Sequence, residues 1–554
     1  MKALQLLSHW IKANKVMLTN AASLIGTTGV TAVLGFAYWG VAARRFSPES
    51  IGIAYASVSM MALLGSFCIL GLGTLLITEL PRQPGQEGSL ISTALILVGV
   101  VGGVVGVLFA LVAPYISPQF SPLRASVMDV LIFGLGVSQT AITLVLDQAL
   151  IGLLRGGVQL WRNTLFAIGK LALLFAISVW ISRVTAMSIY ATWTIGGVLS
   201  LVALALFTLC KKSWRSRNYM PQWSLLKKLG MPALQHHLLN LALQTPTLVL
   251  PVVVTALLSG KMNAWFSISW MIVNVVFLVP SALTTVLHAM NAAQPATLAQ
   301  KARSTMGLAF LTAVVANALL LFGTTQILGL FGKNYAMESA WSLRLLALAA
   351  FPLVIKVHYI SICRIQDRIT QAMASMIPGG VLELVAAAVG AHFGGLSGLC
   401  LAWTLAICCE SLFMLKTVYN AVFSKQIVHP VSEQDYVETE DLWRLETLIM
   451  PAMPTMGQVH TGMQMAWLAD VATQTNIKAI SKADLENRKS ILAGQRLALP
   501  SKPAVGNINN RGLKPKQLQQ YASEHNDNVA YVPETPIPTE MFERDASSLV
   551  EIKR

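Results

Sequence analysis

The sequence predicts an all-α polytopic membrane protein, with about twelve transmembrane helices arranged in two six-helix lobes. Of its 554 residues, 55% are hydrophobic and only 12% are charged, and the mean hydropathy is +0.61. Soluble domains carry about a quarter of charged residues. The spacing of Asp147 and Arg155 recurs six apolar stretches later as Lys356 and Arg364. This recurrence indicates a duplicated unit with ionisable groups inside the membrane.

The predicted elements follow in chain order. Residues 1–19 predict an interfacial helix, because apolar residues recur there at helical spacing between lysines. The N-lobe occupies 20–210, a basic cytoplasmic linker 211–229, and the C-lobe 230–419. The cytoplasmic tail, 420–554, is predicted to be partly helical and then disordered, since its composition becomes polar. The predicted spans are 20–43, 52–78, 89–113, 127–153, 163–182, 188–210, 230–258, 262–290, 305–330, 341–363, 371–393 and 395–419.

The distribution of positive charge predicts the orientation of the chain. The net charge is +15, and with a cytoplasmic N-terminus the inner segments collect sixteen Lys and Arg residues against six on the outer turns. Such an excess marks the cytoplasmic side of a membrane protein. Both termini are therefore expected in the cytoplasm. The charge is explained by orientation, and no nucleic-acid partner is predicted.

Ionisable residues inside the spans are the candidate functional groups. A charge at the bilayer centre costs about 2.5–3.5 kcal/mol, so such residues face a cavity or a partner. Asp147 and Lys356 occupy equivalent positions, and we expect them either to face each other across a central cavity or to line one lobe each. A structural ion pair, or snorkelling near helix ends, remains an alternative. The candidates for ion coupling are Asp147, His236, His237, His358 and Glu383.

Signatures of catalysis and metal binding are missing from the sequence. It contains no HExxH, no phosphate loop, no GxSxG, and no GxGxxG after a strand. Its six cysteines form no CxxC pair and have no histidine at zinc spacing. We therefore expect a protein that is not an enzyme and uses no metal or cofactor. Its energy source would be an ion gradient, the substrate gradient or a partner.

Two stretches resemble a known family of transporters. VAARRFSPESIGIAYASVSMMALLGSFCILGLGTLLITELPR (41–82) has a basic end of the first span, a Pro-Glu loop, a glycine with an aromatic residue, and a Gly-Leu pair. DQALIGLLRGGVQLWRN (147–163) is similar to a fourth-to-fifth span junction. Both resemble the polysaccharide-transporter branch of the multidrug/oligosaccharidyl-lipid/polysaccharide (MOP) exporter superfamily, and the likeness extends over about 1–420. The residues of the first motif are Arg44, Arg45, Pro48, Glu49, Gly52, Tyr55, Gly71 and Leu72.

The resemblance implies a Wzx-type flippase of the bacterial cytoplasmic (inner) membrane. Such a protein turns a lipid-linked oligosaccharide between leaflets through a cavity that opens alternately to each side. The implied partners are the lipid bilayer, the lipid-linked glycan and, through the 420–554 tail, glycosyltransferases or a polymerase. A tail of this length departs from the branch. Relatives have a cationic cavity, and by charge and depth the candidates here are Arg44, Arg45, Lys170, Arg344 and Lys356.

Two other functions fit the sequence. One is a cation-coupled multidrug antiporter of the same superfamily, and the other is a membrane scaffold for polysaccharide-assembly enzymes. A drug antiporter would favour acidic groups for cationic cargo, whereas the spans here hold few deep carboxylates, Asp147 and Glu383. The basic membrane part therefore favours the glycan interpretation.

Overall fold

The computed structural model describes residues 15–83, 85–181, 184–210, 219–224, 231–293, 298–366 and 368–423. The chain divides into two units, Met1–Leu485 and Glu486–Arg554, and every described residue lies in the first. Most of the predicted interfacial helix, the basic linker and the tail lie outside the described residues. Lys15, the first described residue, already belongs to the helix that contains the first predicted span.

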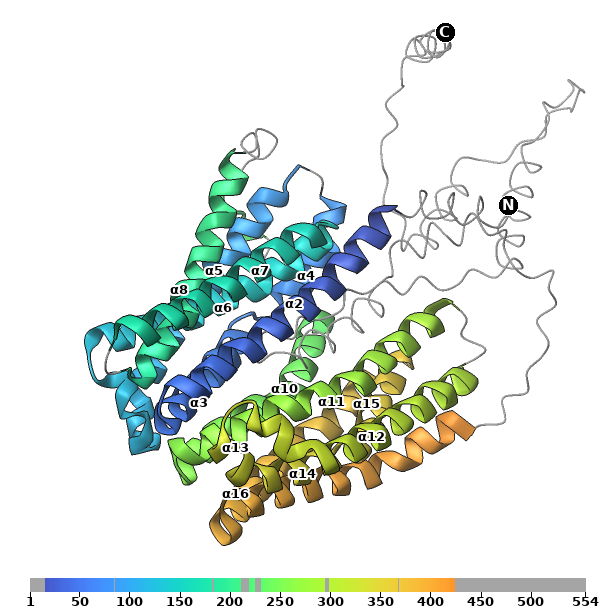
Figure 1. Cartoon of the computed structure of the whole chain (residues 1–554). Coiled ribbons are helices and arrows are strands. Elements are labelled where there is room, and N and C mark those ends of the chain that lie inside the picture. Colours follow the sequence, from blue (N-terminus) through green and yellow to red (C-terminus); the bar gives the residue numbers. More distant parts are fainter. Residues whose placement is uncertain are drawn as a thin grey trace, which may run out of the picture. The chain divides into compact units, whose positions relative to one another are not determined.

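The first half of the described chain is helical throughout (Figure 1). Its second predicted span is broken into α3 and α4, because Leu70 and Gly71 adopt left-handed backbone conformations with φ of 53° and 76°. Ser47 caps α3 by accepting a hydrogen bond from the Ser50 amide, and Pro48 takes the first helical position. The helices are α2 (Lys15–Arg45), α3 (Pro48–Phe67), α4 (Leu72–Glu79), α5 (Glu87–Ile116), α6 (Val127–Gly152), α7 (Gly156–Trp180) and α8 (Ala186–Cys210), with 3-10 turns η1 (Leu80–Arg82) and η2 (Pro118–Arg124).

The second half of the described chain is also helical, and its helices are broken at different places. The tenth predicted span consists of α14 and α15, and the last two spans form α16, interrupted by non-helical backbone at Gly394 and Gly395. Gly395 has a φ of 58°, which favours glycine. The helices are α10 (Met231–Leu257), α11 (Gly260–Ala293), α12 (Leu298–Gly329), α13 (Lys333–Glu338), α14 (Ala340–Leu348), α15 (Ala350–Ile365) and α16 (Ile369–Phe423).

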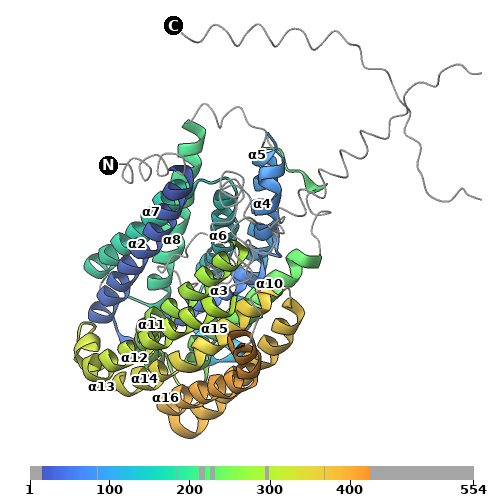
Figure 2. The same cartoon turned by 90° about the vertical axis from the view of Figure 1, so that its right-hand side faces the viewer.

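The predicted all-α membrane fold is confirmed. Within the described ranges, ten segments are long and apolar enough to cross a bilayer, counting Ala340–Ile365 as one and α16 as one. Each predicted span overlaps one helix, part of one helix, or two consecutive helices, but α2 is not among the ten. Twelve crossings therefore remain a prediction. In both views α2 lies beside α7, and α11 lies beside α12 (Figures 1 and 2).

Small residues allow α5 and α6 to approach closely. A Cβ atom added at Gly106 would lie 2.9 Å from the Cα atom of Gly134, and one at Gly102 would lie 3.1 Å from the Cα atom of Ser138. The glycine spacing in the third predicted span therefore marks a helix–helix contact, as expected in lipid. The opposite face of α5 is apolar and exposed, which suits contact with acyl chains.

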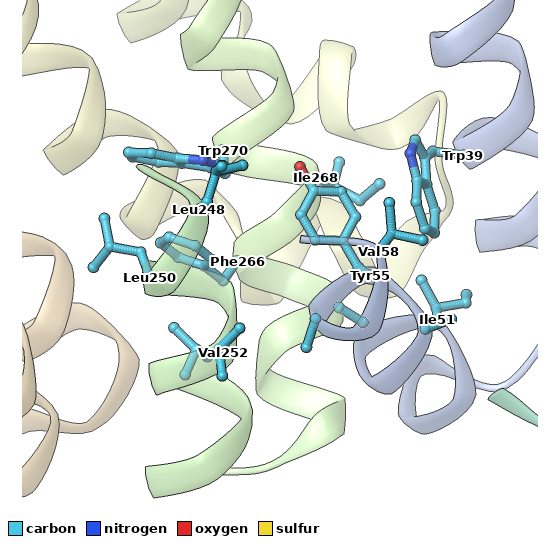
Figure 3. Close-up of a cluster of buried hydrophobic side chains, with 14 of the residues drawn as sticks. Trp39, Ile51, Tyr55, Val58, Leu248, Leu250, Val252, Phe266, Ile268 and Trp270 are labelled. Atoms are coloured by element: carbon cyan, nitrogen blue, oxygen red, sulfur yellow. The ribbon is translucent and has the colours of Figure 1, made fainter. Parts of the chain in front are cut away.

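The two halves meet through α3, the most buried of the candidate spans. Tyr55 and Val58 of α3 pack near Leu248 of α10 and Ile268 of α11 (Figure 3). At the start of the same helices, the Lys261 amide donates to the Glu49 carboxylate at 3.0 Å, and Asn263 Nδ2 donates to the Gly52 carbonyl oxygen at 2.7 Å. These contacts lie at turns that the charge distribution places outside the membrane.

Candidate functional site

A cavity of about 160 Å³ lies among α10, α11, α15 and α16. Three aromatic side chains, Trp270, Phe277 and Trp403, form part of its wall, and the Trp270 and Trp403 rings meet edge to face with centroids 4.9 Å apart. The charged lining residues are Lys356, Arg364 and Glu383. The uncharged polar lining residues are Thr247, Asn274, Ser281, Thr284, Thr285 and Ser361.

Lys356 is the centre of a buried ion cluster at this cavity. Its Nζ atom lies 2.5 Å from Glu383 Oε1 and 2.7 Å from Glu410 Oε2. Trp403 Nε1 donates to the second oxygen of Glu383 at 2.8 Å. The other oxygen of Glu410 is buried and has no hydrogen-bond partner among the described residues. One ammonium group is therefore shared by two carboxylates.

The positions of the charged residues along α15 and α16 bring this cluster together. Lys356 and Arg364 are eight residues apart on α15, and both line the cavity, as the shared helix face predicts. Glu410 reaches the cluster because position 379 is glycine: a Cβ atom there would lie 2.7 Å from the carboxyl carbon of Glu410. Glu383 and Glu410 both lie on α16, on opposite sides of the Gly394–Gly395 break.

Arg364 lies in the last turn of α15, at the end of the candidate span Ala340–Ile365, and its side chain is buried there. It is 2% exposed, lines the cavity, and donates through NH2 to Asn240 Oδ1 at 2.9 Å. His358, two residues after Lys356, points elsewhere: its Nε2 lies 3.3 Å from Thr305 Oγ1 of α12, and its Nδ1 lies 2.7 Å from the carbonyl oxygen of Val354. Lys356 and His358 therefore point to different sides of α15, as a separation of two residues on a helix requires.

Asp147 has a partner in its own half of the molecule. Arg162 NH2 lies 2.9 Å from Asp147 Oδ1 and 3.0 Å from Oδ2, and Asn163 Nδ2 donates to the carboxylate at 3.4 Å. Asp147 and Lys356 therefore do not face each other, which was one of the two predicted arrangements. Each has an ion-pair partner within its own half, as the structural ion-pair alternative predicted. Arg162 was assigned to a cytoplasmic loop, but it is 1% exposed inside α7.

Lys170 is buried among aromatic rings. Its Nζ atom lies 3.5 Å from the ring centroid of Trp193, 4.7 Å from that of Phe166, and 5.4 Å from that of Tyr38. These rings come from α8, α7 and α2 respectively. A small cavity of about 10 Å³ is lined in part by Phe166, Trp193 and Arg162. Its size suits one water molecule.

The other predicted cationic residues lie away from the larger cavity. Arg44 and Arg45 are exposed at the end of α2, where Arg44 Nε donates to the carbonyl oxygen of Leu330 at 2.9 Å. Arg344 is half-buried on α14 and does not line this cavity. His236 and His237 are buried on α10 and also lie outside the cavity lining.

Sequence reasoning missed several residues of the site. Glu410, Trp270 and Trp403 were not among the candidate residues. One signal was available: Lys170 and Glu383 each stand fourteen residues after the first residue of their helices, Gly156 and Ile369. Trp193 and Trp403 likewise stand seven residues after Ala186, which begins α8, and Leu396, which follows the glycine break. With Asp147/Lys356 and Arg155/Arg364, the predicted duplication therefore covers four residue pairs.

No protein-family model matches the chain, and no curated protein sequence matches it. Solved structures do match. One is an inward-facing multidrug resistance MATE family transporter of the MOP superfamily, with a TM-score of 0.55, 15% identity, and coverage of 73% of this chain and 100% of that one. Another is the MATE multidrug transporter DinF-BH, solved with a bound ligand, with a TM-score of 0.54, 13% identity, and coverage of 74% and 97%. The chain is therefore a multi-pass membrane protein with the fold of MATE transporters of the MOP superfamily.

Proposed function

We propose that this protein is a transporter that moves a lipid-linked oligosaccharide across the bacterial cytoplasmic membrane by alternating access. The observation that carries the proposal is the composition of the C-lobe cavity. It combines three aromatic side chains, six neutral polar side chains, two basic groups, Lys356 and Arg364, and one carboxylate, Glu383, in one buried space. The transporter fold and the duplicated bundles support a route across the bilayer rather than a fixed binding protein.

The cavity chemistry matches a sugar phosphate headgroup. Neutral hydroxyl and amide groups such as Ser361 and Asn274 can exchange hydrogen bonds with sugar hydroxyls, and the flat faces of Trp270 and Trp403 offer apolar surface to a sugar ring. The Arg364 guanidinium is suited to bind a phosphate oxygen pair. Charged and polar groups placed in one buried cavity lower the cost of moving such a headgroup through the membrane.

A cation-coupled multidrug antiporter is the second candidate, and one observation favours it. Glu383 and Glu410 carry two negative charges against the single positive charge of Lys356, and Glu410 keeps one buried oxygen without a partner in the described part of the chain. Such a cluster is suited to take up a further cation or a proton. The scaffold hypothesis depends on the tail beyond residue 423, which lies outside the described residues.

Transport of a fluorescent lipid-linked oligosaccharide in proteoliposomes tests the proposal. Asn274 and Asn317 form a matched pair, since each donates through Nδ2 to the carbonyl oxygen four residues earlier, at 2.7 and 2.9 Å. Only Asn274 lines the cavity. We expect Asn274→Ala to slow transport about tenfold, the loss of one or two hydrogen bonds to cargo, and Asn317→Ala to leave it unchanged.

Two outcomes would reject the glycan proposal. One is wild-type protein that leaves the labelled oligosaccharide on its original leaflet while it expels a cationic fluorescent dye under a proton or sodium gradient. This result would establish the antiporter. The other is equal transport by the Asn274→Ala and Asn317→Ala variants, which would place the route of the glycan outside the C-lobe cavity.

A further inference from the structure

The aromatic box around Lys170 has the geometry of a site for an organic cation. Tyr38, Phe166 and Trp193 place their rings within 5.4 Å of one ammonium group, and the Lys170 side chain is fully buried. A cation within about 6 Å of a ring centroid is attracted by the electron-rich face of the ring, most strongly by that of tryptophan. The ammonium is nearest to Trp193, at 3.5 Å. Lys170 therefore takes the position that the charged head of a bound amine would occupy.

The C-lobe has a charged residue and a tryptophan at the corresponding helix positions, but the sign of the charge is opposite. Glu383 takes the place of Lys170, and Trp403 takes the place of Trp193. Trp193 presents its ring face to the Lys170 ammonium, whereas Trp403 donates its ring N–H to the Glu383 carboxylate at 2.8 Å. An indole ring can do both, because its face attracts cations and its edge carries a hydrogen-bond donor. In the C-lobe, Glu383 forms an ion pair with Lys356. Trp403 lines the cavity of about 160 Å³ there.

We infer that the box formed by Tyr38, Phe166 and Trp193 is a cation-binding site whose occupant is Lys170 of the same chain. This built-in ligand excludes organic cations from the N-lobe and leaves the open cavity of the C-lobe to the cargo. The consequence for cargo choice rests on the proposed transport function, but the binding site itself does not. The small cavity lined by Phe166, Trp193 and Arg162 borders the box and provides room beside it.

Replacing Lys170 by alanine removes a propylammonium group from the box, so n-propylammonium is the probe of choice. Isothermal titration of the purified full-length chain in detergent would measure its binding. We expect Lys170→Ala to bind n-propylammonium at least about tenfold more tightly than wild type, and tetramethylammonium more tightly as well. The neutral n-propanol should bind the same variant at least about tenfold more weakly than n-propylammonium, because it lacks the charge that the rings attract.

Lys170→Met is the matched control, since its uncharged side chain refills the box. This variant should bind none of the probes more tightly than wild type. Adding Trp193→Leu to Lys170→Ala should abolish the gain, because the nearest ring is lost. Helix content and thermal unfolding would confirm that each variant is folded, and Lys170→Gly with n-butylammonium replaces any alanine variant that is not.

Three outcomes would overturn the inference. Equal affinity of the folded alanine variant for n-propanol and n-propylammonium would show an apolar hole without cation selectivity. Absence of binding by folded alanine and glycine variants would show that the box takes no ligand. Tight binding by wild type would show that Lys170 does not exclude cations. None of these assays uses a glycan, so their failure is distinct from failure of the transport experiment.

Discussion

The ion cluster at the C-lobe cavity makes a sharp prediction about stability. Lys356→Met removes the only positive partner recorded for Glu383 and Glu410 in the described structure, and both carboxylate side chains are 4% exposed. Removing one partner from a buried ion pair costs about 3–5 kcal/mol, because the remaining charge is left in a poorly solvated place. Two carboxylates are left here, so we expect a loss at or above the lower end of this range.

Glu410→Gln is the matched variant, because it removes one carboxylate and leaves the pair of Lys356 and Glu383 at 2.5 Å balanced in charge. Its effect should stay below about 1 kcal/mol, the scale of one ordinary hydrogen bond. Combining Lys356→Met with Gln at positions 383 and 410 should recover most of the lost stability, since no charge is left unpaired. Unfolding in detergent by heat or denaturant would measure all three.

The charge argument is refuted if Lys356→Met unfolds at the wild-type midpoint. It is equally refuted if Glu410→Gln is as destabilising as Lys356→Met, since that result would assign the effect to packing. The charge argument is also refuted if the neutral triple variant, Lys356→Met with Glu383→Gln and Glu410→Gln, is no more stable than Lys356→Met alone. The side chains of Met and Lys are similar in length, so steric loss is small.

Two further predictions concern other parts of the fold. Arg162→Met should cost about 3–5 kcal/mol in unfolding free energy, because Asp147 is left buried without its ion-pair partner. Adding Asp147→Asn should restore part of this loss, and a double variant as unstable as Arg162→Met alone would contradict the reasoning. Gly52→Val should separate the starts of α3 and α11, because a Cβ atom at this position would lie 1.7 Å from the Gly260 carbonyl oxygen, whereas Gly29→Val meets nothing within 4 Å. Cross-linking of cysteines introduced beside this contact should fall for Gly52→Val and persist for Gly29→Val; equal cross-linking would show that the halves do not depend on it.

Much of the fold could be predicted, because a membrane-spanning helix requires a run of consecutive apolar residues, which is visible in the sequence. A membrane span needs about 20 apolar residues, and every predicted span overlaps one helix, part of one, or two consecutive helices. The helix breaks were less visible. Leu70 adopts a left-handed conformation beside Gly71 inside an apolar run, and hydropathy averages over such a single residue. The Gly394–Gly395 break, by contrast, fell at the predicted boundary between the last two spans.

The candidate site was only partly predictable. Lys356 and Glu383 were recognised as deep charges, and Arg364 was correctly placed on the same face of its helix as Lys356. Their pairing could not be inferred, since Lys356 meets a carboxylate 27 residues away and another 54 residues away. Arg162 was assigned to a loop because a basic residue near a span end usually faces the cytoplasm. Its burial depends on the Asp147 carboxylate in the neighbouring helix.

The sequence by itself determined that this is a membrane protein and that it is all-helical, and it predicts two duplicated halves, because hydropathy and spacing are properties of consecutive residues. Only the tertiary structure decided which charges neutralise one another, which tryptophans face a cavity, and that Lys170 fills an aromatic box. The reason is that no water is available in the lipid to solvate a buried charge. Its partner is therefore another side chain, and helix packing between residues distant in the sequence decides which one.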